Sequence, residues 1–477
     1  MRYAENARSG SPPPRSVSAS AFITVAGMNL EVFTPSEVAS LEASRGTLHA
    51  PWTVAYCVWE NPYAKSGGIG AVARDLPPAL AAAGAGVIVI SPWHSRLKTA
   101  HADLVAMSDI EVPFGGRPVR LRLLETRAGA VRRVYLDAPG HFTADGGAEG
   151  KDPYIYSHDP CATADDCSLL RDSLLACAAV PHALAALGAT RNVIVHAQDW
   201  QFASVALTTK LALLQGFLQS AAVFVTSHNP YDHQLSPAML GLITDRTDAQ
   251  LWNIEGQPAV DSVCAHMLPL ADGPISTVSR TFARELTSDP LLSTHFTPHL
   301  QRIYRVLGVV GIPNGRFGKP PSVERAKLEK RRAMLEALAA YRDPRQLGRL
   351  DAGVASHVPV FFTFGRFDPG QKGFDVLARA IEAIPPGMAR FILAPQARDM
   401  NAFPADRPFL ADLARLASAR PGEVVVYPFQ MEPAVYGAIM QGASYAVMPS
   451  LYEPFGAATE PYLAGTPVVA RATGGLA

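Results

Sequence analysis

The sequence predicts an α/β protein built from two doubly wound domains in tandem, with the ligand site in a cleft between them. From residue 52 onward, short runs rich in β-branched residues alternate with helical stretches rich in alanine and leucine. The runs are continuously apolar, which is typical of strands buried on both faces of a parallel sheet. The alternation occurs both before and after a charged helical stretch at residues 319–350, which predicts a solvated connecting helix between two sheets.

The first half of the chain carries predicted parallel strands and an inserted antiparallel segment. Helical stretches at 76–84, 169–188 and 203–214 separate the apolar runs. The parallel strands are predicted at 52–59, 86–91, 192–197, 221–228 and 275–279. Segments 111–125 and 132–139 predict the antiparallel insertion.

The second half repeats the pattern. Its predicted strands are 358–365, 389–395, 423–429, 445–450 and 466–470, with helices at 373–384, 408–419 and 433–442 between them. The series stops at ATGGLA, directly after a strand and a glycine turn, so we expect the second domain to be C-terminally incomplete. The predicted division is a disordered or poorly structured lead-in over 1–50, a first domain over 51–310 and a second over 311–477.

The charge balance argues against two classes of protein. The 42 basic and 42 acidic side chains give a formal net charge of zero. A nucleic-acid binder or a polybasic membrane anchor would normally carry a basic excess. No uninterrupted apolar run approaches the roughly 20 residues needed to span a bilayer. We therefore expect a soluble protein with neither nucleic acid nor membrane as a partner.

The cysteines and the lead-in bear on the compartment. The five cysteines are an odd number and contain no CxxC pair, so they predict buried thiols in a reducing compartment rather than a zinc site or a disulfide framework. The segment SGSPPPRSVSAS predicts disorder over at least the first 20 residues. Its arginines leave open a transit peptide, so the expected location is cytoplasmic, with a plastid as the alternative.

Polar and glycine-rich turns follow the predicted strands of the first half. AKSGGIG contributes Lys65 and the glycines Gly67 and Gly68, which could bring backbone N–H groups close to an anion. HAQDWQ contributes Asp199, and TSHNPY contributes His228. The turn at Lys65 fits neither GxGxxG nor a GK[ST] phosphate loop, so it is a weak signal by itself.

The second half carries matching turns. GRFDPGQKGFD contributes Arg366 and Lys372, and the stretch that begins YEPFG contributes Glu453 and Glu460. A final turn contributes three more residues, Thr473, Gly474 and Gly475. Because the carboxyl ends of parallel strands meet at one sheet edge, we expect the turns of both halves to form one site.

Taken together, these motifs resemble those of the bacterial glycogen synthases and plant starch synthases, which have the GT-B fold with two Rossmann-like domains. KSGGIG, AQDWQ, the His–Asn turn, TVSRTFARE, the QKG segment, YEPFG and RATGGL occur in the order of that family. The resemblance covers roughly residues 52–477 and implies a retaining glucosyltransferase that extends an α-1,4-glucan from ADP-glucose or UDP-glucose. It makes the first domain the acceptor and catalytic domain and the second the nucleotide-sugar-binding domain.

The cationic residues are expected to stabilise the leaving group of the reaction. Departure of a nucleoside diphosphate develops negative charge, which preorganised cations and N–H donors stabilise. Arg366 and Lys372 are the expected pair, because arginine binds phosphate as a fork and lysine as a point charge. Lys65, with the Gly67 and Gly68 backbone, would complete the cradle from the other domain. We expect no metal and no cofactor.

The resemblance assigns the remaining residues to the sugars and the nucleotide. It implies that Glu453 supports the donor sugar as positive charge develops, that His228 contacts the donor glucose, and that Glu460 holds the ribose. Asp199 is placed near the acceptor or the sugar. The final turn is assigned to donor binding through Thr473, Gly474 and Gly475.

Some positions depart from the family pattern, and they keep other interpretations open. Ala71 stands where the family usually has aspartate, and NGRF replaces NGID at 314–317. The alternatives are a retaining GT-B transferase with another acceptor and a non-catalytic glucan-binding or regulatory homologue. A glucan phosphorylase is disfavoured, because it would need a pyridoxal-phosphate lysine in a second domain that has few lysines.

Overall fold

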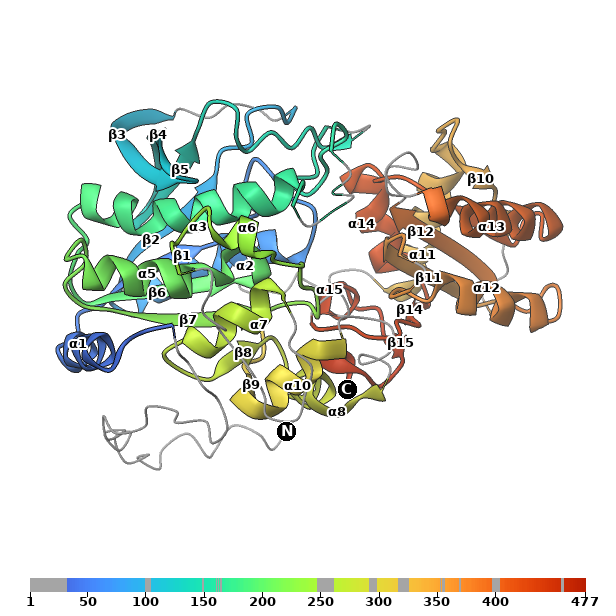
Figure 1. Ribbon diagram of the computed structural model, residues 1–477. Coiled ribbons are helices and arrows are strands. Elements are labelled where there is room, and N and C mark those ends of the chain that lie inside the picture. Colours follow the sequence, from blue (N-terminus) through green and yellow to red (C-terminus); the bar gives the residue numbers. More distant parts are fainter. Residues whose placement is uncertain are drawn as a thin grey trace.

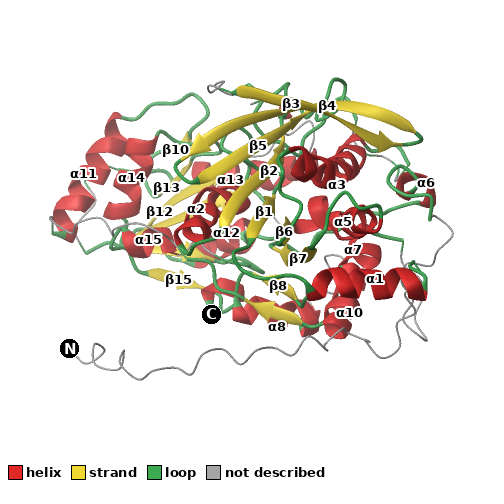
Figure 2. Ribbon diagram, turned by 90° about the vertical axis from the view of Figure 1, so that its left-hand side faces the viewer, coloured by secondary structure: helices red, strands yellow, loops and turns green. Residues whose placement is uncertain are grey.

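The computed structural model contains two β-sheets, one in each half of the chain (Figure 1). It describes residues 32–477 except 99–103, 148–149, 160, 162, 164, 247–260, 291–297, 316–325, 352, 354–356, 369, 397–403 and 456–458. Both sheets are covered by helices, as the alternating pattern predicts (Figure 2). The predicted pair of doubly wound α/β units is therefore confirmed.

The first sheet has nine strands in the order β3-β4-β5-β2-β1-β6-β7-β8-β9. From β5 to β9 all neighbours are parallel, whereas β3, β4 and β5 pair antiparallel, which confirms the predicted insertion. In chain order the strands are β1 (Thr53–Cys57), β2 (Gly86–Pro92), β3 (Val105–Phe114), β4 (Arg117–Ala128), β5 (Val131–Asp137), β6 (Val193–Gln198), β7 (Ala221–Ser227), β8 (Ile275–Thr277) and β9 (Val309–Gly311).

Helices cover both faces of this sheet because the strand residues alternate between two apolar clusters. Tyr56 and Val89 pack with α2 (Gly68–Ala82) on one face, while Cys57 and Ile90 join the larger cluster with α3 (Ser168–Ala186) and α5 (Val205–Leu214) on the other. The remaining helices are α4 (Asp199–Ala203), α6 (Pro237–Leu240), α7 (Val263–Met267), η2 (Leu268–Leu270), α8 (Arg280–Ser288) and α10 (Pro298–Leu307).

Helix α3 is long and apolar enough, by length and composition, to cross a membrane. Its 18-residue window has a mean hydropathy of 1.3, but 72% of that window is buried inside the protein. It lies beside α5 in both views of the molecule (Figures 1 and 2). A core helix of this kind passes the same test as a membrane span, so the finding is weak evidence for one.

The second sheet has six strands in the order β10-β13-β12-β11-β14-β15. All neighbours are parallel except β10 and β13. The strands are β10 (Leu347–Gly348), β11 (Val360–Arg366), β12 (Arg390–Gln396), β13 (Val424–Val426), β14 (Tyr445–Met448) and β15 (Val468–Ala470). The helices are α11 (Lys327–Ala340), α12 (Phe374–Ala383), η3 (Pro404–Asp406), α13 (Arg407–Ala419), α14 (Pro433–Gly442), α15 (Thr459–Leu463) and η4 (Gly474–Leu476).

Two expectations for the N-terminal half are wrong. The predicted unstructured lead-in holds a helix, α1 (Pro35–Gly46), which starts with a capping box between Thr34 and Glu37 and has contacts to α5 and β7. Residues 1–31 lie outside the described part of the chain. Cys161 and Cys167 form a disulfide, whereas Cys57, Cys177 and Cys264 are buried free thiols as expected. The sequence separation of six lacks the CxxC signal, so spacing alone could not reveal the pair.

Candidate functional site

At the carboxyl edge of the first sheet, Asp199 and His228 lie next to each other. Asp199 follows β6 and starts α4, while His228 follows the neighbouring strand β7. The His228 backbone N–H donates to the Asp199 carboxylate, and both side chains are buried. Asp199 has φ +58°, a left-handed conformation that is uncommon outside glycine, asparagine and aspartate and that clusters at functional sites.

Burial reduces the charge that the side chains of this edge carry. Desolvation, reinforced by His196, lowers the pKa of His228 to about 3, so its imidazole is neutral at physiological pH. The ring nitrogen Nε2 of His228 lies 2.8 Å from Gln198 Oε1. Desolvation also raises the pKa of Asp199 to about 7, although the backbone N–H groups of His228 and Asn229 oppose the shift.

The glycine-rich turn after β1 is closed around a buried carboxylate. The backbone N–H groups of Ser66, Gly67 and Gly70 all donate to Glu60 Oε2, at 3.2, 3.1 and 3.0 Å. Lys65 is exposed at the start of this turn. The predicted N–H cradle therefore exists, but Gly67 already donates to a side chain of the protein itself.

At the edge of the second sheet, Lys372 and Glu453 form an ion pair. Lys372 Nζ donates to Glu453 Oε2 at 2.6 Å, and Ser450 Oγ donates to the same oxygen at 3.0 Å. Both side chains are largely buried, 12% and 5% exposed, so the pair is poorly screened by solvent. An ammonium has three N–H donors, so one bond to Glu453 leaves capacity for an anionic ligand.

Arg366 ends β11 beside this pair. Gln371 Oε1 lies 3.5 Å from its Nη2 atom. Burial lowers the pKa of the guanidinium, but Tyr231, Asp368, Tyr452 and Asp152 more than compensate, so the net shift is upward. Because Tyr231 and Asp152 belong to the first half of the chain, this fixed positive charge faces both halves.

The final turn is tied to both edges of the site. Thr473 Oγ1 and the Gly474 N–H donate to Glu285 Oε1, each at 2.9 Å, and Glu285 lies on α8 of the first half. The Gly475 N–H donates to the backbone carbonyl of Glu453 at 2.8 Å. Figure 1 shows the C-terminal end of the chain beside α8. These bonds join the turn to the Glu453 loop, and its role in donor binding stays a prediction.

Further contacts cross between the two halves. The hydroxyls of Tyr231 and Tyr452 lie 2.8 Å apart, and Tyr452 belongs to the main apolar cluster of the first half. Glu460, on α15, interacts electrostatically with Arg74 of α2 and helps Asp75 to raise the pKa of that guanidinium. The two strand edges that carry the predicted residues therefore face one another.

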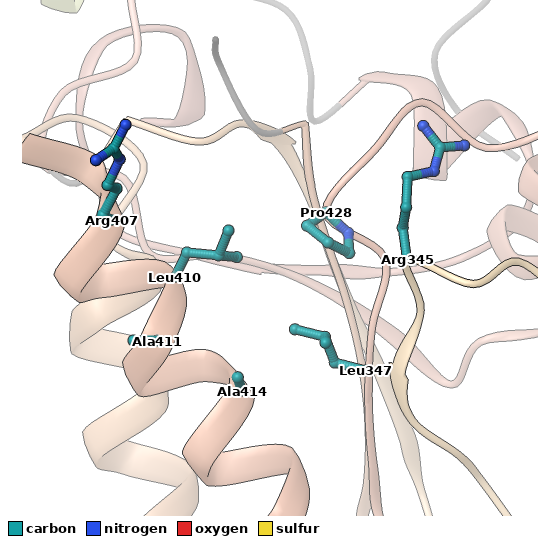
Figure 3. Close-up of a pocket in the computed structure, with 7 residues that line it drawn as sticks. All are labelled: Arg345, Leu347, Arg407, Leu410, Ala411, Ala414 and Pro428. Carbon is teal, nitrogen blue, oxygen red and sulfur yellow. The ribbon is translucent and has the colours of Figure 1, made fainter. Parts of the chain in front are cut away.

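A cavity of about 480 Å³ lies elsewhere, between α13 and the β10 edge of the second sheet. Leu410 and Leu347 extend toward each other across it (Figure 3). The rim residue Arg345 is already paired with Asp343 at 2.8 Å. The cavity contains none of the predicted site residues and is not the candidate site.

The structure thus brings the predicted residues to two facing edges. Glu453 contacts both Lys372 and the final turn directly, and Asp199 and His228 form the opposite pair. Sequence reasoning missed Glu60, Glu285 and Tyr231. Of these, Glu285 lies within the TVSRTFARE segment, where the family match was a signal that could have found it.

Similarity to known proteins identifies the family of this chain. The starch synthase catalytic domain family matches residues 53–302, more than half of the chain. A glycogen synthase from Dechloromonas aromatica is 30% identical over 428 residues, which cover 87% of this chain and 81% of that protein. This chain belongs to the glycogen and starch synthase family. It is a glycosyltransferase, as the order of its motifs predicts.

Other comparisons agree with that assignment. A glycogen synthase from Roseobacter denitrificans is 30% identical over 435 residues, covering 87% of this chain and 82% of that protein. A family of glycosyltransferases in conflict systems matches residues 329–477. The catalytic domain of starch synthase IV from Arabidopsis thaliana superimposes with a TM-score of 0.69 at 21% identity, over 89% of this chain and 83% of that one. The chain therefore has the GT-B fold.

Proposed function

We propose that this synthase transfers glucose from ADP-glucose, in preference to UDP-glucose, to the non-reducing end of an α-1,4-glucan with retention of configuration. The observation that carries the proposal is the cationic second edge, where Arg366 and the Lys372–Glu453 pair face the edge that holds Asp199 and the uncharged His228. A diphosphate fits the cationic edge, and an uncharged sugar fits the edge that holds His228.

The leaving group would be stabilised by the second edge. The bond between the anomeric carbon and the diphosphate oxygen breaks, and Lys372 and Arg366 offset the negative charge that develops on the diphosphate. Positive charge grows on the sugar ring at the same time. The Glu453 carboxylate accepts a hydrogen bond from Lys372 at 2.6 Å, and its negative charge can oppose the positive charge on the sugar.

The acceptor step retains configuration. The 4-hydroxyl oxygen of the glucan bonds to the anomeric carbon on the face that the diphosphate leaves, and its proton passes to the departing phosphate oxygen. The neutral His228 imidazole can hydrogen-bond a sugar hydroxyl without adding charge. Closure of the two halves would exclude water and limit hydrolysis. No metal or cofactor enters these steps.

A structural relative supports the choice of donor. The starch synthase IV structure was determined with ADP and acarbose, an adenine nucleotide and a glucan-like sugar. Both bacterial relatives are glycogen synthases. We propose a cytoplasmic location for the reaction.

The decisive experiment measures nucleotide release from ADP-glucose and from UDP-glucose, with and without glycogen. We expect release that requires glycogen and is faster from ADP-glucose. The same assay is repeated with Lys372→Ala, which removes a lysine of the proposed diphosphate site. Lys327→Ala is its matched control, because Lys327 is a half-buried lysine that donates to Thr466 away from the site. Faster release from UDP-glucose would overturn the donor assignment. Folded enzyme that requires another acceptor would overturn the glucan assignment.

A further inference from the structure

Glu60 occupies the place where an anionic ligand would bind at the start of α2. The first backbone N–H groups of a helix have no partner within the helix and attract anions. Here Gly67 is the N-cap residue of α2, and its N–H and that of Gly70 both point to Glu60 Oε2. The protein itself therefore supplies the anion that the glycine-rich turn was expected to take from a ligand.

The carboxylate is held on its other side as well. Tyr154 donates its hydroxyl to Glu60 Oε1 at 3.2 Å, and the glutamate is only 2% exposed. Asp152 extends the network, because Ser66 Oγ donates to it at 2.6 Å. The same Asp152 helps to raise the pKa of Arg366 in the second half. The network around the turn thus reaches a cation of the proposed diphosphate site.

Gly70 shows how closely the turn is built around Glu60. A Cβ atom at this position would lie 2.7 Å from Glu60 Oε2 and 2.7 Å from Lys65 Cγ. The stem of Lys65 therefore runs directly over Gly70, on the same side as the Glu60 carboxylate. Any shift of the turn would move the first carbons of the Lys65 side chain.

We propose that Glu60 is a positioning residue for the transfer reaction: its buried carboxylate fixes the glycine-rich turn and thereby aims the Lys65 ammonium at the diphosphate. The turn contributes to the reaction through Lys65, while its N–H groups serve the internal bond to Glu60. This inference rests on the proposed function, and it adds a residue that acts through another one.

The test compares Glu60→Gln with Lys65→Ala and with the double variant. Glutamine keeps the size of the side chain but replaces the carboxylate that accepts three backbone N–H bonds with an uncharged amide. We expect kcat with the preferred donor to fall about 10–100-fold for each single variant, because misplacing a catalytic group costs rates of this order. The KM for glycogen should stay unchanged. The double variant should be no slower than Lys65→Ala alone, because Glu60 acts through Lys65.

Glu125→Gln is the matched control. Glu125 is another buried glutamate of the first half, 3% exposed and bonded to Arg132 at 2.8 Å; it lies on β4, between the edge strand β3 and β5. It should lower thermal stability as Glu60→Gln does, but leave kcat unchanged. Glu60→Asp, which keeps the charge, should recover part of the lost kcat.

Two results would overturn the inference. One is wild-type kcat in folded Glu60→Gln, which would make the glutamate purely structural. The other is a double variant whose loss equals the product of the single losses, which would mean that Glu60 does not act through Lys65. A wild-type enzyme without nucleotide release would instead count against the proposed function, so the two failures are distinguishable.

Discussion

The two facing edges of the site use their polar groups in opposite ways. On the first edge, burial keeps His228 uncharged and raises the pKa of Asp199 to about 7. The backbone N–H groups of the glycine-rich turn there donate to the buried side chain of Glu60. On the second edge, Lys372 and Glu453 form a largely buried ion pair. The comparison teaches that the same feature, a turn after a parallel strand, can surround a carboxylate with backbone N–H groups on one side and place a buried ion pair on the other.

The largest expected effect concerns the two lysines. Lys372→Ala should lower kcat on the order of 10³-fold, as removal of one preorganised donor does. Lys65→Ala should cost at least ten times less, because Lys65 is exposed and solvent screens its charge. Steady-state nucleotide release at saturating glycogen measures both. Equal losses would contradict the division of labour between the edges.

Gly474→Ala should come second. Gly474 has φ +50°, and a Cβ there would lie 1.8 Å from the backbone carbonyl oxygen of Glu453. The turn would have to shift and move Glu453 with it, so we expect kcat to fall about 100-fold. Gly437→Ala is the control, because a Cβ at that second-sheet glycine meets nothing within 4 Å. Normal kcat in Gly474→Ala would show that the final turn does not position Glu453.

The raised pKa of Asp199 predicts that the stability of the protein depends on pH. The pKa of Asp199 is about 7 in the folded protein, against about 3.9 in the unfolded chain. Between these values the folded state binds the extra proton, so the Asp199 contribution to stability falls as pH rises from about 4 to about 7. Asn tolerates the left-handed backbone, so Asp199→Asn should fold and remove this contribution.

The measurement is the difference in unfolding free energy between wild type and Asp199→Asn across this pH range. The difference isolates Asp199 from the buried histidines, whose lowered pKa values give the opposite slope. We expect the wild type to lose stability relative to the variant by up to about 1.4 kcal/mol per pH unit. Parallel curves would mean that Asp199 titrates at its ordinary pKa.

The fold was largely predictable because parallel strands leave a strong one-dimensional signal. Continuous apolar runs predicted most strands of both sheets, but not β9, and not β10, which lies in the stretch predicted as helical. The turns after the predicted strands contributed Lys372, Glu453, Asp199 and His228. Helix α1 was missed because a proline- and serine-rich neighbourhood hid the capping box at Thr34.

Partners distant in the chain were the least predictable. Glu453 has no cation near it in the sequence, yet it pairs with Lys372, 81 residues earlier. Glu60 was missed for a related reason: its role exists only because the turn folds back onto it. A sequence motif readily predicts the residues that contact a ligand. It does not as readily predict the residues that hold the motif in position.

The smallest expected effect concerns Gly68, the predicted partner of Gly67 in the phosphate cradle. Gly68 is the first residue of α2, and a Cβ there would meet nothing within 4 Å. Gly68→Ala should therefore fold normally and gain up to about 1 kcal/mol, because alanine favours the helix. Thermal unfolding measures the change in stability, and steady-state nucleotide release measures kcat and the KM for the donor. Unchanged kinetics would mean that the donor meets this turn only through Lys65. A raised donor KM would mean that the diphosphate approaches the Gly68 backbone directly, so that the first edge would contact the phosphate through its backbone as well as through Lys65.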